Sequence, residues 1–134
     1  MAEKAEIQIE VRAWSPVVFS EPAGAPSLVR ISVEESFAGD VTGTGSAELL
    51  QVLSGDGSAS FVAVERVTAT LAGRAGTFVL QDKGTLDTEG NVEGEWFVVP
   101  GSGTGELATL SGSGGFSAKL GEHAKAYLDY AFDA

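Results

Sequence analysis

Residues 95–117 read EWFVVPGSGTGELATLSGSGGFS and indicate the architecture of the whole chain. An apolar stretch runs to Pro100, a turn rich in Gly, Ser and Thr follows, and a second stretch begins at Glu106. Glycine turns the chain sharply at no steric cost, and β-branched and aromatic residues favour the pleated strand. The segment therefore predicts two closely connected β-strands, over residues 92–99 and 106–118.

The N-terminal part of the chain shows the same preference for strands. Apolar and polar residues alternate over residues 7–13, which is the period of a half-buried strand. Trp14 is predicted to end this strand, because Pro16, Pro22 and Pro26 follow in what reads as a loop. The sequence Ser-Gly-Asp-Gly at 54–57 predicts a tight hairpin, since Asp-Gly supplies the positive φ angles of such turns. Further strands are predicted over residues 28–37, 41–53, 58–71, 76–86 and 125–132.

Eight predicted strands with mostly short connections favour an all-β fold, and residues 1–134 are expected to form a single domain. Closure into one eight-stranded, mostly antiparallel up-and-down β-barrel removes the sheet edges, and a two-sheet sandwich is the alternative. A barrel of this size holds either packed side chains or one small ligand. The strand at 58–71 is apolar on both faces, so the pattern does not say which face points inward.

The composition narrows the classes of function. Eight Lys and Arg stand against 19 Asp and Glu, a net charge of −11, and the chain has no Cys. Nucleic-acid affinity rests largely on Lys and Arg, so neither nucleic acid nor an anionic membrane surface is an expected partner. No apolar run approaches the length of a membrane helix, and residues 1–11 lack the pattern of a signal peptide. We therefore expect a cytoplasmic protein.

Several segments together resemble a known bacterial family. They are GSASFV at 57–62, GTFVLQ at 76–81, VVPGSGTGEL at 98–107 and GGFS at 114–117. These segments look like the family called domain of unknown function 3224, and the resemblance covers residues 14–132. It implies a small β-barrel similar to allene oxide cyclase, and no settled activity. The resemblance also leads us to expect His at position 82, where this chain carries Asp82.

Allene oxide cyclases hold a fatty-acid epoxide in an apolar barrel cavity, so the resemblance implies a hydrophobic ligand here. Gln81, Asp82 and Glu106 are candidate polar contacts to that ligand. The alternative is that the aromatic side chains simply fill the barrel. The aromatic candidates for lining a cavity are Phe61, Phe78, Trp96, Tyr127 and Tyr130.

Two acids are candidate catalytic groups. Glu65 is in step with Phe61 along its strand, and Glu35 lies between Val33 and Phe37. A carboxyl on an apolar face has a raised pKa through desolvation, which suits a general acid or base. The alternative is that both point outward or pair with a neighbouring arginine.

Other kinds of site lack support in the sequence. The glycine-rich loop at 101–105 has no following helix and no nearby Lys, so it reads as a turn and not as a phosphate-binding loop. His123 is the only histidine and no nucleophile elbow opens a helix, which disfavours a Ser-His-Asp triad. Neither a metal site nor a cofactor is expected.

Three hypotheses about function follow. The first is a barrel that binds a small apolar or amphipathic ligand. The second is a lyase, isomerase or cyclase that uses Glu65 or Glu35 as acid or base. The third is a non-catalytic protein whose apolar outer strands associate into a homo-oligomer, either a dimer or a trimer.

Overall fold

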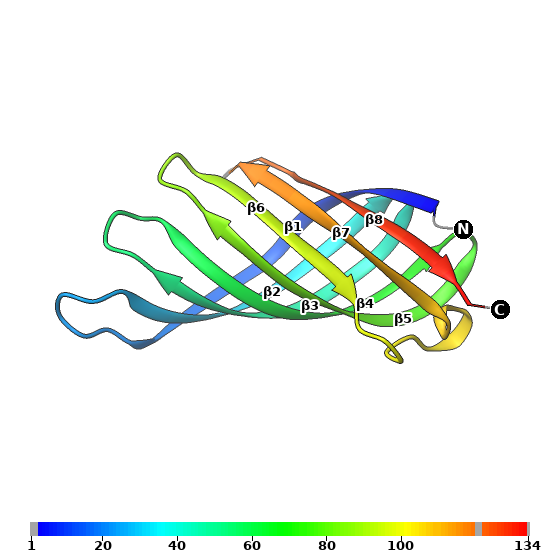
Figure 1. Cartoon of the computed structure of the whole chain (residues 1–134), viewed down its shortest axis with the longest axis horizontal. Coiled ribbons are helices and arrows are strands. Elements are labelled where there is room, and N and C mark those ends of the chain that lie inside the picture. The colour runs from blue at the N-terminus through cyan, green and yellow to red at the C-terminus, as the bar shows by residue number, and fades with distance from the viewer. Residues whose placement is uncertain (1–2, 120–121, 134) are drawn as a thin grey trace.

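The computed structural model describes residues 3–119 and 122–133, and the chain forms a closed β-barrel (Figure 1). Eight strands follow one another around the barrel in chain order, and every neighbouring pair is antiparallel. The predicted all-β, eight-stranded antiparallel barrel is therefore confirmed. The strands are β1 (Glu3–Ser20), β2 (Ser27–Gly39), β3 (Val41–Leu53), β4 (Ala59–Leu71), β5 (Arg74–Leu86), β6 (Asn91–Val98), β7 (Leu110–Lys119) and β8 (Ala124–Phe132), and one short 3-10 helix, η1 (Gly105–Leu107), precedes β7.

Strand β4 shows how the sequence divides between the two faces of the wall. Its residues alternate strictly between buried and exposed along the whole strand. Phe61, Ala63 and Glu65 point into the barrel, whereas Val62 and Val64 lie on the outer face. The pleat places alternate residues on opposite sides, so one inward residue settles the direction of the rest. The structure thus shows which face of β4 points inward, which the sequence pattern of residues 58–71 does not say.

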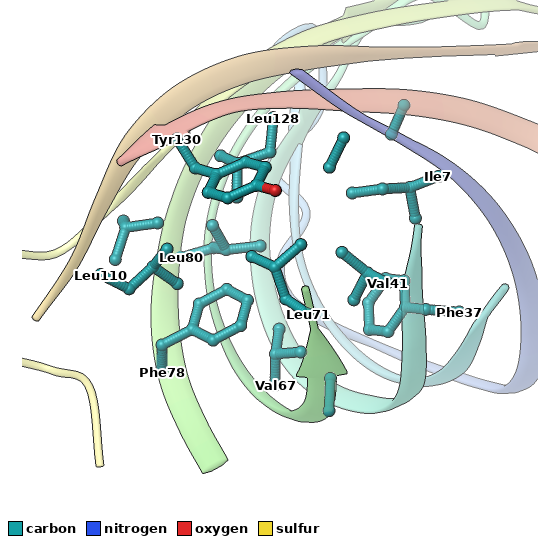
Figure 2. Packing of buried hydrophobic residues seen from close by; sticks show 14 of the residues in the cluster. Ile7, Phe37, Val41, Val67, Leu71, Phe78, Leu80, Leu110, Leu128 and Tyr130 are labelled. Atoms are coloured by element: carbon teal, nitrogen blue, oxygen red, sulfur yellow. The ribbon is translucent and has the colours of Figure 1, made fainter. Parts of the chain in front are cut away.

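One end of the barrel is packed with apolar side chains (Figure 2). We call it the closed end, and it carries the start of β1, the end of β8, the β4–β5 turn and η1 (Figure 1). Leu71, Phe78, Leu107 and Leu128 are at most 2% exposed there. Such packing leaves no room for a ligand at the closed end.

The opposite end carries the β1–β2, β3–β4 and β5–β6 hairpins (Figure 1). We call it the open end. A second, smaller apolar cluster of Val29, Ile31, Val33 and Ala47 covers part of its inner wall. Val11, Trp14 and Val18 of β1 lie opposite inward-facing residues of β2, so they are on the inner face of the wall as well. Each of the three is nevertheless about half exposed. The interior is therefore asymmetric, closed at one end and accessible at the other.

Strand β1 differs from the prediction, because it does not end at Trp14. It continues to Ser20, and Pro16 lies opposite Ile31 in the β1–β2 ladder. Among the described residues, β1 pairs with β8 only up to Ile9, so its second half has a partner on one side only. Proline lacks a donor but is tolerated at such an edge, which is why it does not break the strand.

The segment after β6 also differs from the prediction, which placed a strand from Glu106. Gly105 adopts a φ of +60°, and residues 105–107 form η1 before β7 begins at Leu110. The amide of Thr104 first donates to the carbonyl of Thr77 at 2.8 Å, which ties the loop to β5. The 3-10 turn then inserts Leu107, with no exposed surface, against the closed end.

The described residues contain no helix long and apolar enough to cross a membrane.

Leu71→Ala tests the packing of the closed end. The side chain is 1% exposed within the main apolar cluster, so we expect the free energy of unfolding to fall by about 2–5 kcal/mol. Val62→Ala, on the outer face of the same strand, should change it by less than about 0.5 kcal/mol. Urea denaturation measures both values. Equal losses in the two variants would contradict the assignment of faces.

Candidate functional site

Three acidic side chains point into the barrel, where the closed and open ends meet. They are Glu35 on β2, Glu65 on β4 and Asp82 on β5. Each keeps the alternation of its strand, with buried apolar residues two positions before or after it. We call Glu35, Glu65 and Asp82 the interior carboxyls. The sequence hypothesis that Glu65 lies in step with Phe61 on an inward face agrees with this placement.

A glycine on β3 leaves the space in which the Glu65 side chain approaches Glu35. Gly45 lies between them, opposite Glu35 on one side and Val67 on the other. A Cβ atom at Gly45 would overlap Oε2 of Glu65 and would come within 2.8 Å of the Phe37 ring. Any larger residue at position 45 would therefore displace the Glu65 carboxyl.

Glu65 is deeply buried and incompletely paired. The residue is 2% exposed, and in the part of the chain that the structure describes its Oε2 atom has no hydrogen-bond partner. Burial, the hydrogen bond with the Glu35 carboxyl and the charges of Glu35 and Asp82 together raise the pKa of Glu65 to about 11. Glu65 is thus a neutral carboxylic acid at neutral pH, with an O–H group to donate.

Asp82 has a different protonation state near neutral pH. Burial, followed by the charge of Glu35, raises its pKa to about 7. Its Oδ1 atom is buried and has no hydrogen-bond partner among the described residues. Asp82 therefore exchanges a proton in the physiological range, which is the range of the histidine expected at this position.

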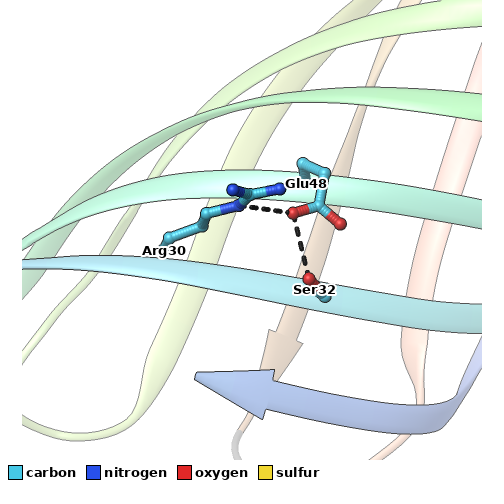
Figure 3. Close-up of polar contacts among 3 residues, drawn as sticks. All are labelled: Arg30, Ser32 and Glu48. Carbon is cyan, nitrogen blue, oxygen red and sulfur yellow. Dashed lines mark hydrogen bonds and ion pairs between the residues drawn. The ribbon is translucent and has the colours of Figure 1, made fainter. Parts of the chain in front are cut away.

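Basic side chains do not reach the interior carboxyls, because all eight Lys and Arg residues are exposed, as is His123. The ion pairs lie on the outer face. Arg30 Nε donates to Oε1 of Glu48 at 2.9 Å, and the Ser32 hydroxyl donates to the same oxygen (Figure 3). Lys83 pairs with Glu95 at 3.0 Å on the outer face of β5 and β6. The sequence alternative that Glu35 and Glu65 pair with arginine therefore does not hold.

Aromatic rings border the interior carboxyls. Trp96 lies opposite Asp82 on β6, and its indole N–H donates to the carbonyl of Tyr127 at 2.9 Å. Phe116 packs between Trp96 and Phe61, with ring centroids 5.3 and 6.3 Å away. Phe116 was not among the predicted site residues, although the GGFS segment that carries it was recognised.

The other predicted contacts lie elsewhere. Phe78 and Tyr130 point inward but belong to the packed closed end, where they fill the core. Gln81 and Tyr127 are exposed on the outer face, because each is one residue out of step with an inward neighbour. Glu106 is exposed on η1 and accepts a 3.3 Å hydrogen bond from the amide of Ala75. These residues do not join the interior carboxyls. Within residues 3–119 and 122–133, no three His, Cys, Asp or Glu are placed to hold a metal ion together.

Comparison with known proteins agrees with this architecture. The family described as protein of unknown function, DUF3224, matches residues 5–130. This chain belongs to the DUF3224 family. A DUF3224 protein with unknown function from Shewanella oneidensis MR-1 has a similar crystal structure, with a TM-score of 0.84 and 29% sequence identity over 100% of both chains. No curated protein matches the chain. The family and the barrel are thus shared, and the resemblance to allene oxide cyclase remains a prediction.

The stability of this DUF3224 protein should depend on pH through Glu65. The pKa of Glu65 is raised from 4.5, the value that applies in the unfolded chain, to about 11 in the fold. At neutral pH the folded chain therefore holds a proton that the unfolded chain releases. The stabilisation is full below about pH 4.5 and is lost as the pH rises. Between about pH 6 and 8, Glu65 should lower the free energy of unfolding by about 1.4 kcal/mol per pH unit.

Urea denaturation across that range measures the slope in the wild type and in Glu65→Gln, which carries no titratable group. In the variant, the decrease of the free energy of unfolding with pH should be smaller by about 1.4 kcal/mol per pH unit, which corresponds to one proton. Glu93→Gln, at an exposed outer position, is the matched control and should keep the wild-type slope. A slope unchanged by Glu65→Gln would show that this carboxyl ionises as freely in the fold as in the unfolded chain.

Proposed function

We propose that the barrel binds a small amphipathic molecule through its open end. The apolar part of the ligand lies against the inner wall, and its polar end reaches the interior carboxyls. The observation that carries the proposal is the pair of buried, unpartnered oxygens, Oε2 of Glu65 and Oδ1 of Asp82. Buried polar atoms are nearly always hydrogen-bonded, so two unpaired oxygens on the inner wall indicate that a bound ligand supplies their hydrogen-bond partner.

The inner wall of the open end suits an apolar ligand. Val29, Ile31, Val33 and Ala47 cover the β2 and β3 side. Leu49 and Leu53 are half-buried against them, and Trp14 is 53% exposed on the same inner face. Apolar surface of this kind is stabilised when a ligand removes it from water. The packed closed end provides a floor, so the ligand enters from one side only.

A lyase, isomerase or cyclase activity is the second candidate, and Asp82 is the observation that favours it. A general base works best with a pKa near the working pH, and the pKa of Asp82 is about 7. Glu65, held neutral, suits the role of proton donor. In this candidate mechanism, Asp82 removes a proton from a bound ligand and Glu65 supplies one, with no change in oxidation state.

Association of copies of the chain is the third candidate. Leu50 and Val62 lie opposite each other on the outer face of β3 and β4, and both are more than half exposed. They line a groove of about 1060 Å³ with Phe97 and Val64. A dimer or trimer formed through this face would bury them. Sedimentation of the wild type and of Val62→Glu measures this association, and equal monomeric masses at high concentration would exclude it.

Octanol tests the proposed function, because it is neutral, small and amphipathic. Trp14 and Trp96 both face the interior, so a saturable change in tryptophan fluorescence should report binding. Ala63→Leu adds bulk on the inner wall beside Asp82 and should weaken binding by at least about tenfold, as expected when added methylenes fill a site.

Val64→Leu is the matched control, since it adds bulk at the next residue on the outer face. It should leave octanol affinity unchanged. Thermal unfolding of both variants verifies that they fold. If Ala63→Leu does not fold, Leu49→Phe, which also adds bulk on the inner wall, takes its place. No saturable change with the wild type, or equal effects of the inner and outer variants, would overturn the proposal.

A further inference from the structure

The barrel interior holds acidic groups with no positive group to balance them. Glu35, Glu65 and Asp82 face inward from three different strands. All eight Lys and Arg side chains are exposed, and the ion pairs of Arg30 and Lys83 lie on the outer face. Burying carboxyls without a counter-charge costs free energy, and buried acids normally have a partner. In the empty barrel Glu65 therefore stays protonated, and a cationic group would supply the partner that its ionised form lacks.

The positions of the unpartnered oxygens say where such a group would sit. Oε2 of Glu65 lies over Gly45, between β2 and β4, in a residue that is 2% exposed. Oδ1 of Asp82 is on β5, the strand next to β4. Both oxygens accept hydrogen bonds once their carboxyls ionise, and within residues 3–119 and 122–133 neither has a donor.

We propose that the interior site takes an amphipathic cation, in which an apolar chain or ring system ends in an ammonium or amidinium group that donates hydrogen bonds to Glu65 and Asp82. This inference rests on the proposed function, because it names the chemical class of the same ligand. Charge-assisted hydrogen bonds between N–H groups and carboxylates are stronger than neutral ones, above all where water is excluded.

The aromatic surroundings favour the same class of ligand. Trp96 lies opposite Asp82, and its hydrogen bond to Tyr127 holds the indole in place. The Phe37 ring lies beside Gly45 and the Glu65 carboxyl. Aromatic faces attract cations, with Trp the strongest, so both rings add to the affinity for an ammonium group. A carboxylate ligand would gain nothing from these rings and would be repelled by the charges of Glu35 and of ionised Asp82.

Binding of the cation is coupled to proton release. The groups that face Glu65 are Glu35 from β2 and Asp82 from β5, with a further contribution from the charge of Glu34, while β3 presents only Gly45 and Ala47. All of the charged neighbours are acidic, so they favour the protonated forms of Glu65 and Asp82 in the empty barrel. An ammonium group reverses that preference, and the carboxyls lose protons as it binds. Amine affinity should therefore rise with pH up to the pKa of the amine.

The test compares octylamine, octanol and octanoate, which share one chain and differ in the head group. Calorimetry and tryptophan fluorescence at pH 7 measure the three affinities. Octylamine should bind at least about tenfold more tightly than octanol, and octanoate more weakly than both. Calorimetry in two buffers of different ionisation enthalpy should show proton release with octylamine and none with octanol.

Glu65→Gln and Asp82→Asn should each reduce the ratio of octylamine to octanol affinity by at least about fivefold, with octanol affinity largely kept. Glu93→Gln removes a charge from the outer face and should leave the ratio unchanged. Two variants are used so that the test survives a folding defect in one of them. The acidic protein attracts any amine weakly, and Glu93→Gln together with added salt separates that attraction from the interior site.

The outcomes separate this inference from the proposed function. Binding of octanol without preference for octylamine, or a preference that survives both interior variants, overturns the cationic ligand and leaves the ligand-binding barrel standing. Failure of all three compounds to bind overturns both. A preference for octylamine that disappears in the interior variants and is kept in Glu93→Gln supports the inference.

Discussion

The ladder between the first and last strands is the constraint on which the rest of the structure depends. Seven residue pairs, from Glu3↔Tyr130 to Ile9↔Ala124, join β1 to β8 and turn a meander into a barrel. Only a closed wall gives the inward residues of all eight strands a common interior, and closure also pairs the first half of β1 with β8, which would otherwise both be free edges. The acids on β2, β4 and β5 share one environment because of this ladder, although none of them belongs to the two strands that it joins.

The length of that ladder also makes the two ends different. Strand β1 is 18 residues long, and its pairing with β8 stops at Ile9. Within the described residues, its second half pairs with β2 alone. Trp14 and Val18 therefore point inward where the barrel wall is incomplete, and both are about half exposed. At the other end, η1 and the β4–β5 turn cover the core with Leu107 and Leu71. The interior carboxyls lie at the boundary, where water is largely excluded but access remains.

Much of the fold could be predicted because period-two alternation and turn chemistry are local signals. The strand at 41–53 was predicted to the residue, and most others to within one or two. The errors arose where tertiary contacts decide. Pro16 reads as a strand breaker, yet it is harmless at an edge that lacks a partner. The stretch from Glu106 reads as a strand, yet the need to bury Leu107 under the barrel end makes its first turn a 3-10 helix.

The candidate site was predictable only in part, for the same reason. The sequence by itself determined the strands, their order, the family, the excess of acid and the two carboxyls in step with apolar neighbours. The tertiary structure alone decided that Asp82 joins Glu35 and Glu65 inside, that Gln81 and Tyr127 lie outside, and that no Lys or Arg faces the interior. Alternation along a strand states which residues share a face, but only closure of the barrel states which face is the inside. That choice separates a solvated carboxyl from a buried one, and it is made by contacts between strands far apart in the chain.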